Sequence, residues 1–341
     1  MKKFFIFASI FFIACSPELG YPWYNGNISE ALKINQDKII MLDFYADWWG
    51  ACKRLDADTF TNTEVINFSE KSLISLKVDV DTKEGSEIST EYNIQSLPTI
   101  VFVNSSNDEL DRIIGYMPPE TYLKRLNEIV KGENTIDDLL DKYNSSRNAS
   151  VISLLAKKYF ERGKYEYANS KYLELINNYK DADSSLIDEA VFQIAMIKFY
   201  NDDISGLTEY INVNNNIDFK KTALSKLKRY YRSNADIDNE LNIHVRSLLM
   251  FPKDPNILNS YAWRMSELEM NLEDAIIKVN KAIVLSVNDK NKQANILDTK
   301  AEVLWKLGNS EEAVKTIDMA IQLNPDNDYF IEQKDKFLSK K

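Results

Sequence analysis

Two cysteines, Cys15 and Cys52, and a single histidine, His244, are the residues of this 341-residue sequence best suited to nucleophilic or metal chemistry. A structural zinc site needs four ligands, mostly Cys and His, and a hydrolase triad needs a histidine beside its nucleophile. Three such residues, far apart in the chain, supply neither arrangement. The sequence therefore predicts no metal site and no cofactor, and it leaves the thiols as the groups that could react.

Cys15 closes an apolar N-terminal segment. Residues 4–14 form a predominantly apolar run after two lysines, shorter than the ~20 residues that cross a bilayer as a helix. Such a run is typical of a signal peptide. Its end, Phe12-Ile13-Ala14-Cys15, resembles the bacterial lipobox, in which the cysteine carries the lipid. The resemblance predicts a signal peptide over residues 1–15 and a lipid anchor on Cys15, on the periplasmic side of the bacterial cell envelope. An ordinary secretory signal with an incidental cysteine is the alternative.

The pattern around Cys52 predicts an α/β domain over residues 27–131, which follows a tether at residues 16–26. Apolar β-rich runs bounded by polar residues predict strands at 38–45, 73–80, 98–103 and 109–114. Helices are expected from about residue 49, at 82–92 and at 119–130. The expected order is βαβαββα, and Cys52 lies near the start of the helix that follows the first strand.

The segment from Asp43 to Lys53, DFYADWWGACK, resembles the active-site segment of the thioredoxin family, D-F-[WY]-A-x-W-C-x-x-C-K. Further matches are Thr59-Phe60, the Leu97-Pro98-Thr99 segment where the family has its cis-proline, and Gly115 before the last helix. The pattern is most similar to the C-terminal thioredoxin-like domain of periplasmic thiol:disulfide interchange proteins. The resemblance implies a thioredoxin fold for this domain.

Trp49 replaces the first cysteine of the family's redox pair. That cysteine lies at a helix N-terminus, where the helix dipole and free N–H groups lower its pKa and make it the nucleophile. Without it, no disulfide can close within the site. The sequence therefore excludes a dithiol cycle of the thioredoxin type.

Cys52, at the position of the family's resolving cysteine, has two interpretations. As a monothiol it would capture a client cysteine in a mixed disulfide, helped by Lys53 and the helix N-terminus. Asp43, where the family has a buried carboxylate, would then help to move the proton. As a structural residue Cys52 would pack as a small hydrophobe, and Asp43 would be a satisfied buried carboxylate. The shielded position of the resolving sulfur in the family favours the structural interpretation.

The Leu97-Pro98 segment predicts a peptide-binding edge next to Trp48 and Trp49. In the family, the backbone before the cis-proline pairs with extended substrate peptides, a form of strand addition. Trp48, Trp49 and Leu97 would give this edge an apolar rim, suited to holding a peptide without any redox step. Alternatively, Trp49 turns inward and fills the space that the missing cysteine leaves.

From Gly132 onward the pattern becomes helical and repetitive, beginning with a helical linker at residues 132–148. Small residues and a final proline have the spacing of the ~34-residue tetratricopeptide repeat; they are Ala301, Gly308, Ala313, Ala320 and Pro325. The resemblance predicts an all-α solenoid of such repeats over residues 149–341. The repeats are clearest at 149–182, 256–289 and 294–327, with weaker helix pairs over 185–253 and a capping helix that ends with residues 335–341. His244 is expected to be a packing or surface residue.

Charge and module types together indicate the class of partner. The net charge is −10 and the sequence has no basic block, so nucleic acid is not an expected partner. Thioredoxin-like edges and tetratricopeptide arrays both hold peptides. The sequence favours a cell-envelope lipoprotein that acts as a protein-binding adaptor for envelope proteins or peptides. The alternative is a monothiol disulfide oxidoreductase or isomerase that uses Cys52 on envelope client proteins. A chaperone that shields unfolded envelope proteins would use the same rim as the adaptor.

Overall fold

The computed structural model describes residues 20–34 and 38–339. Cys15 and the predicted signal peptide lie outside the described residues. The chain divides into two compact units, Met1–Ile197 and Lys198–Lys341.

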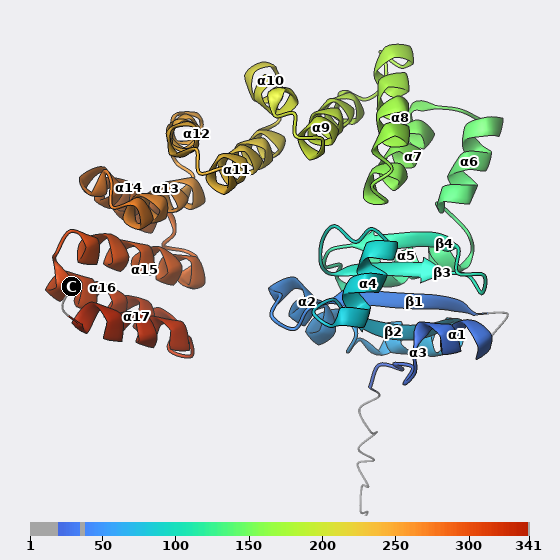
Figure 1. Cartoon of the computed structure of the whole chain (residues 1–341), viewed down its shortest axis with the longest axis horizontal. Coiled ribbons are helices and arrows are strands. Elements are labelled where there is room, and N and C mark those ends of the chain that lie inside the picture. The colour runs from blue at the N-terminus through green and yellow to red at the C-terminus, as the bar shows by residue number, and fades with distance from the viewer. Residues whose placement is uncertain (1–19, 35–37, 340–341) are drawn as a thin grey trace, which may run out of the picture. The chain divides into compact units, whose positions relative to one another are not determined.

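A four-stranded sheet forms the centre of the N-terminal domain (Figure 1). Its strands are β1 (Ile39–Tyr45), β2 (Leu73–Asp79), β3 (Thr99–Val103) and β4 (Glu109–Ile114), in the order β2-β1-β3-β4. β1 pairs parallel with β2 and antiparallel with β3, and β3 pairs antiparallel with β4. The sheet therefore contains all four strands expected from the sequence, each with its ends within one residue of the expected position.

The helices of this domain are more numerous than the sequence pattern indicates. They are α1 (Ile28–Ile34), α2 (Gly50–Arg54), the π-helical turn η1 (Leu55–Thr59), α3 (Thr63–Ser72), α4 (Lys83–Glu91) and α5 (Pro119–Val130). The expected order βαβαββα was wrong in two places, because it lacked α1 and joined α2 to α3. α1 buries only Ala31, so its apolar signal is weak. Asn62 separates α3 from the preceding turn, because its side chain accepts hydrogen bonds from the N–H groups of Glu64 and Val65.

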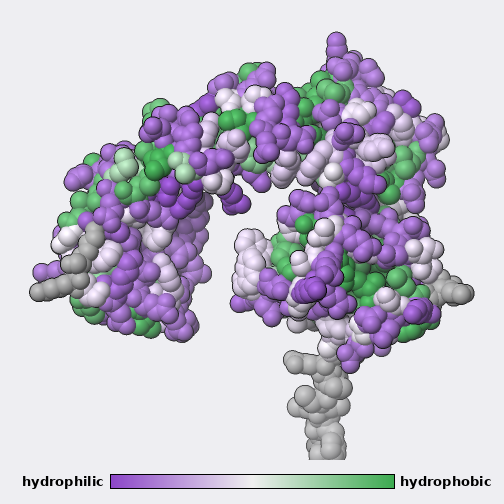
Figure 2. All heavy atoms as spheres, in the orientation of Figure 1, coloured by the Kyte–Doolittle hydropathy of each residue, from purple (hydrophilic) through white to green (hydrophobic). Residues whose placement is uncertain are grey.

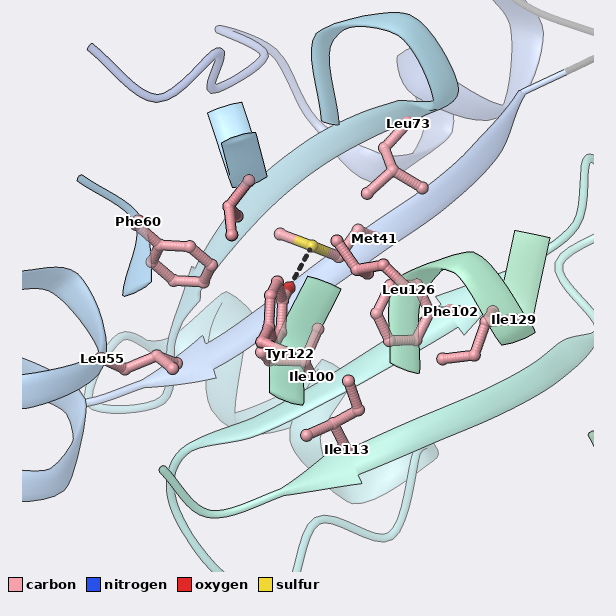
Figure 3. Close-up of a cluster of buried hydrophobic side chains, with 11 residues drawn as sticks. Met41, Leu55, Phe60, Leu73, Ile100, Phe102, Ile113, Tyr122, Leu126 and Ile129 are labelled. Carbon is pink, nitrogen blue, oxygen red and sulfur yellow. Dashed lines mark hydrogen bonds between the residues drawn. The ribbon is translucent and has the colours of Figure 1, made fainter. Parts of the chain in front are cut away.

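Both faces of the sheet are covered, which explains why the sequence of β1 is a continuous apolar run. Side chains alternate along a strand, so Met41 faces one core while Ile40 and Leu42 face the other. Figure 3 shows the first core, where α5 contributes Tyr122 and its hydroxyl donates to the Met41 sulfur at 3.2 Å. The same alternation turns Asp43, a carboxylate, toward the core that contains Met41.

Part of the predicted tether belongs to the domain. The Tyr21 ring lies 4.6 Å from the Phe60 ring, and its hydroxyl donates to the Ser69 hydroxyl at 3.0 Å. Trp23 forms an isolated parallel bridge with Ser75 of β2. A tether was expected for residues 16–26, but Tyr21 and Trp23 pack against the first core, and Tyr24 packs against the core that contains Ile40. Burial of these aromatic side chains removes their large apolar area from water, which favours packing against the domain.

Helices make up the rest of the chain. Within the first unit they are α6 (Ile136–Ser145), α7 (Ala149–Glu161), α8 (Tyr165–Asn178) and the larger part of α9 (Ser184–Tyr200). The second unit contains α10 (Ser205–Val213), α11 (Ile217–Ser233), α12 (Ile237–Met250), α13 (Pro255–Leu268), α14 (Leu272–Leu285), α15 (Lys290–Lys306), α16 (Ser310–Leu323) and α17 (Asp328–Leu338). Helix pairs occur where the sequence predicts them. The last helix, predicted to end with residues 335–341, spans Asp328–Leu338 and is capped by the Asn327 side chain.

Small residues lie at the closest helix crossings. Ala301, Ala313 and Ala320 are fully buried where α15 packs against α16, and Gly308 turns the chain between them with φ +81°. Hydrophobic and hydrophilic residues are interspersed on the visible face of the molecule (Figure 2). None of the helices in the described part of the chain combines the length and apolar character that crossing a membrane requires.

The C-terminal end of α7 contacts the sheet domain within the first unit. Asn93 donates from its side-chain amide to the Arg162 carbonyl at 2.9 Å, and Arg112 donates to the Glu161 carbonyl at 3.1 Å. Gly163 follows with φ +67°, and a Cβ there would lie 1.9 Å from the Asn93 side chain. The first helical hairpin and the sheet domain are thus built against one another.

Candidate functional site

The site lies where β1 ends and α2 begins. Trp49 is the N-cap of α2, with extended backbone (φ −89°, ψ 118°) and no capping by its own side chain. Its carbonyl accepts from the N–H groups of Cys52 and Lys53, which starts the helix. This backbone role leaves the indole of Trp49 at the surface and places Cys52 one turn into the helix.

Cys52 is buried, with 3% of its surface exposed. Burial raises the pKa of the thiol, and the nearby carboxylates of Asp43 and Asp56 raise it further, against a hydrogen bond with Ala46 and the charge of Lys77. The thiolate, which is the nucleophilic form, is therefore disfavoured at neutral pH.

Asp43 is a buried carboxylate with incomplete pairing. Its Oδ2 lies 3.8 Å from the ammonium of Lys77, while Lys77 approaches Asp56 to 2.5 Å. The Oδ1 atom of Asp43 is buried and has no hydrogen-bond partner. Burial raises its pKa to about 7, Lys77 opposes this rise and Asp56 adds to it. Near neutral pH this group can therefore hold or release a proton beneath Cys52.

Lys77 and Asp56 also belong to this site and were not predicted from the sequence. The β1–β2 register pairs Asp43 with Lys77, so the parallel sheet itself brings the two together. A lysine inside the apolar run of β2 was a signal that could have suggested this pair. Asp56 lies in the π-helical turn, which no sequence pattern indicated.

Trp48 and Trp49 form an exposed aromatic surface beside the Leu97-Pro98 bond, which is cis. Their side chains are 64% and 45% exposed, and the rings meet edge to face with centroids 5.7 Å apart. The Trp49 indole N–H donates to the Leu97 carbonyl at 2.8 Å. The Trp48 indole N–H donates to Asp81 at 2.7 Å. Both rings are thus fixed in place, and Trp49 does not fill the space beneath.

The structure separates the predicted site residues into two groups. Asp43 and Cys52 share the buried cluster with Lys77. The rim consists of Trp48, Trp49, Leu97 and Pro98, of which Pro98 is buried and Leu97 half-buried. Lys53 is exposed on α2 and joins neither group. Cys15 lies outside the described residues.

His244 is a packing residue of the helical region. It is buried in α12, with Nε2 3.9 Å from Glu240, and burial lowers its pKa to about 3. Among residues 20–34 and 38–339, no cluster of three His, Cys, Asp or Glu side chains is placed to hold a metal ion.

Comparison with known proteins gives matches to the N-terminal domain. A family model for a thioredoxin-like domain matches residues 28–129. The thiol:disulfide interchange protein DsbD of Tatumella citrea is 31% identical over 124 residues, which are 34% of this chain and 22% of that protein. Thioredoxin-T of Drosophila melanogaster is 37% identical over 92 residues, which are 26% of this chain and 53% of that protein.

Similar solved structures also cover only part of this chain. The C-terminal domain of Neisseria meningitidis DsbD in its oxidised form is 27% identical, with a TM-score of 0.26, covering 29% of this chain and 86% of that chain. The chain spans about a fifth of the length of the DsbD relatives that it matches. Residues 28–129 are therefore a thioredoxin-like domain, and they resemble domains of thiol:disulfide interchange proteins.

Proposed function

We propose that this protein is a lipid-anchored adaptor of the bacterial cell envelope that binds envelope proteins or peptides and runs no dithiol cycle. One observation carries the proposal. The position of the family's nucleophilic cysteine holds Trp49, whose indole is exposed, and the remaining thiol of Cys52 is buried beneath it. A surface built in this way is suited to contact and poorly suited to thiol exchange.

The exposed faces of Trp48 and Trp49 are the binding surface in this proposal. Both indole N–H groups are already hydrogen-bonded, so the rings lose little conformational freedom when a partner covers them. A partner segment lies across the exposed indole faces, beside the Leu97 carbonyl to which Trp49 donates. Large aromatic side chains held in this manner are frequent at the energetic centres of interfaces.

The other parts of the chain have supporting roles in this proposal. The lipobox-like sequence ending at Cys15 supports a membrane anchor. The helix pairs over residues 149–323, with small residues at their crossings, support a tetratricopeptide-like scaffold that offers a second binding surface.

A photo-crosslinking amino acid at position 48, in living cells, tests the adaptor. We expect adducts that persist unchanged in a Cys52→Ala background. The matched control places the same crosslinker at Ile34 of α1, which is 60% exposed and belongs neither to the rim nor to the helix pairs. Adducts formed equally from both positions would contradict a specific binding surface at the rim.

A monothiol oxidoreductase is the second candidate, favoured by Asp43, whose pKa of about 7 allows proton transfer beneath Cys52. In that reaction the Cys52 thiolate attacks a client disulfide and forms a mixed disulfide. The client's other sulfur leaves and takes up a proton. An external thiol then attacks the Cys52 sulfur and releases the client as a dithiol, and a second external thiol restores the Cys52 thiol while the two external thiols become a disulfide. Alkylation of Cys52 distinguishes the two functions. Rapid labelling of the folded chain near pH 7 supports the enzyme, and protection until unfolding supports the adaptor.

A further inference from the structure

A cavity of about 350 Å³ lies between β4, α5, α6 and α7, away from the rim. All four elements belong to the unit that ends at Ile197. The apolar side chains that line it are Ile113, Ile114, Met117, Leu139 and Leu154. Cavities of this size, at the junction of two folded parts and with mostly apolar walls, are typical sites for small ligands.

Asp111 of β4 forms ion pairs with two cations that line this cavity, Arg125 and Lys158. It is fully buried. Its carboxylate forms ion pairs with Arg125 of α5, with Lys158 at 2.6 Å and with Arg162 at 3.6 Å. A single carboxylate cannot balance three positive charges, so the neighbouring acids decide the local charge.

Two further carboxylates join this network of ion pairs. Glu109 pairs with Arg112 at 2.5 Å and with Arg162 at 3.0 Å. Glu128 pairs with Arg125 at 2.6 Å. The network thus has four cations and three carboxylates; they are Arg112, Arg125, Lys158 and Arg162 against Glu109, Asp111 and Glu128. Lys157 and Glu161, which also line the cavity, add one charge of each sign. One positive charge therefore remains in excess among these residues, although the whole chain carries −10; the exposed Asp137 acts on Arg162 from outside the cavity lining.

Lys158 is the cation best placed to meet a ligand. Its ammonium has three N–H donors, and within the described part of the chain the structure gives it one acceptor, Asp111. Its side chain is 12% exposed and lines the cavity. Burial lowers the pKa of Lys158 to about 7; Glu161 opposes this, while Arg125, Arg162 and Lys157 contribute to it. The neighbouring positive charges thus disfavour the charged form of this ammonium.

We propose that this cavity binds a small aliphatic monocarboxylate. The carboxylate pairs with Lys158 and Lys157, and the chain lies against Ile114, Leu139 and Leu154. A monoanion balances the single surplus charge. An uncharged ligand leaves it unbalanced, and a cation adds to it. The apolar walls favour a ligand with a hydrocarbon chain over a bare anion such as acetate.

Calorimetric titration of the full chain with octanoate tests the proposal. We expect saturable binding at one site, with octanol, octylamine and acetate each at least tenfold weaker. Leu154 is 42% exposed, so Leu154→Glu places a like charge at the cavity mouth without removing a core residue. That variant should bind octanoate at least tenfold more weakly. The matched control is Leu173→Glu in α8, where the leucine is 43% exposed and outside the cavity, and it should bind as the wild type does.

Proton uptake provides a second measurement. A bound carboxylate stabilises the charged ammonium of Lys158 among its neighbours Asp111, Arg125, Arg162, Glu161 and Lys157. Octanoate binding near pH 7 should therefore take up a proton, and the apparent binding enthalpy should change with the ionisation enthalpy of the buffer. The affinity should fall as the pH rises above 7. Equal binding of octanoate and octanol, absence of octanoate binding, or an unchanged affinity in Leu154→Glu would overturn the proposal.

Discussion

At the scale of single residues, Asp43 shows how one buried group links stability to pH. Its Oδ1 has no hydrogen-bond partner, and its nearest cation, Lys77, is shared with Asp56 at shorter range. Burial therefore favours the neutral acid in the folded protein, whereas the unfolded chain ionises near its ordinary value of 3.8. The folded state binds the proton more tightly than the unfolded state does.

This difference predicts a pH dependence of stability. The contribution of protonated Asp43 is fully present below pH 4 and is lost as the pH rises through about 7. Asp43→Asn cannot ionise, so it should match the wild type near pH 4 and exceed it at pH 8 by on the order of 3 kcal/mol. Urea unfolding at both pH values measures this. Asp47→Asn, at an exposed position beside the site, should leave the difference between pH 4 and pH 8 as it is in the wild type.

Restoring the first cysteine tests whether the scaffold still supports redox chemistry. Trp49→Cys places a thiol at the N-cap of α2, three residues before Cys52, with Asp43 and cis-Pro98 in place. Because a thiol at a helix N-terminus has a lowered pKa, we expect insulin-disulfide reduction at least tenfold above that of the wild type. Trp49→Ser removes the same indole without adding a thiol and should stay inactive. An inactive Trp49→Cys protein that folds normally would show that α2 has lost the geometry of the family.

The sequence predicts the residues of the site better than their surroundings. Asp43, Cys52, Trp49 and the Leu97-Pro98 segment follow from the resemblance to the thioredoxin motif, whose residues have a fixed order along the chain. The proximity of Lys77 to Asp43 follows from strand register instead, and the Trp49 contact with the Leu97 carbonyl depends on a side-chain conformation. Spacing does not encode either of these, because both join segments that are distant in the chain.

At the scale of elements, strands were easier to predict than short helices. A strand buried on both faces is a continuous apolar run with visible ends, as in β1 and β3. α1 and α3 bury few residues, and the break between α2 and α3 depends on the cap at Asn62. The charged residues of β4 suggest an exposed strand. In the structure Asp111 and Arg112 are buried, and Arg112 donates to the Glu161 carbonyl of α7.

The Asn62 cap can be tested directly. Asn62→Ala removes the acceptor for two N–H groups at the start of α3, so we expect a loss of about 1 kcal/mol in the free energy of unfolding. Hydrogen exchange at Glu64 and Val65 should accelerate accordingly. Asn309 is also an N-cap asparagine, at α16, but makes no side-chain cap bond. Asn309→Ala should therefore have a smaller effect, below about 0.5 kcal/mol.

At the scale of the whole molecule, the sheet domain and the first helical hairpin form one folded unit. The ion pairs of fully buried Asp111 with Arg125 and Lys158 join β4 to α5 and α7, and both cations are largely buried. Asp111→Asn should therefore lower the free energy of unfolding of this unit by about 3–5 kcal/mol, because buried cations lose their counter-charge. Thermal unfolding followed by circular dichroism, together with limited proteolysis of residues 132–148, measures the effect. A shift no larger than that of Asp47→Asn would show that the network adds no stability.

The contacts at the C-terminal end of α7 have a consequence for the helical array as a whole. Stacked helix pairs need a polar cover on the outer face of their first member, and terminal repeats normally provide it. Here the side chains of Asn93 and Arg112 satisfy the last carbonyls of α7, and Gly163 lets the two parts approach closely. The thioredoxin-like domain thus covers the C-terminal end of α7 within the first unit. A helical fragment cut free at residue 149 would lose these contacts, and we expect it to self-associate.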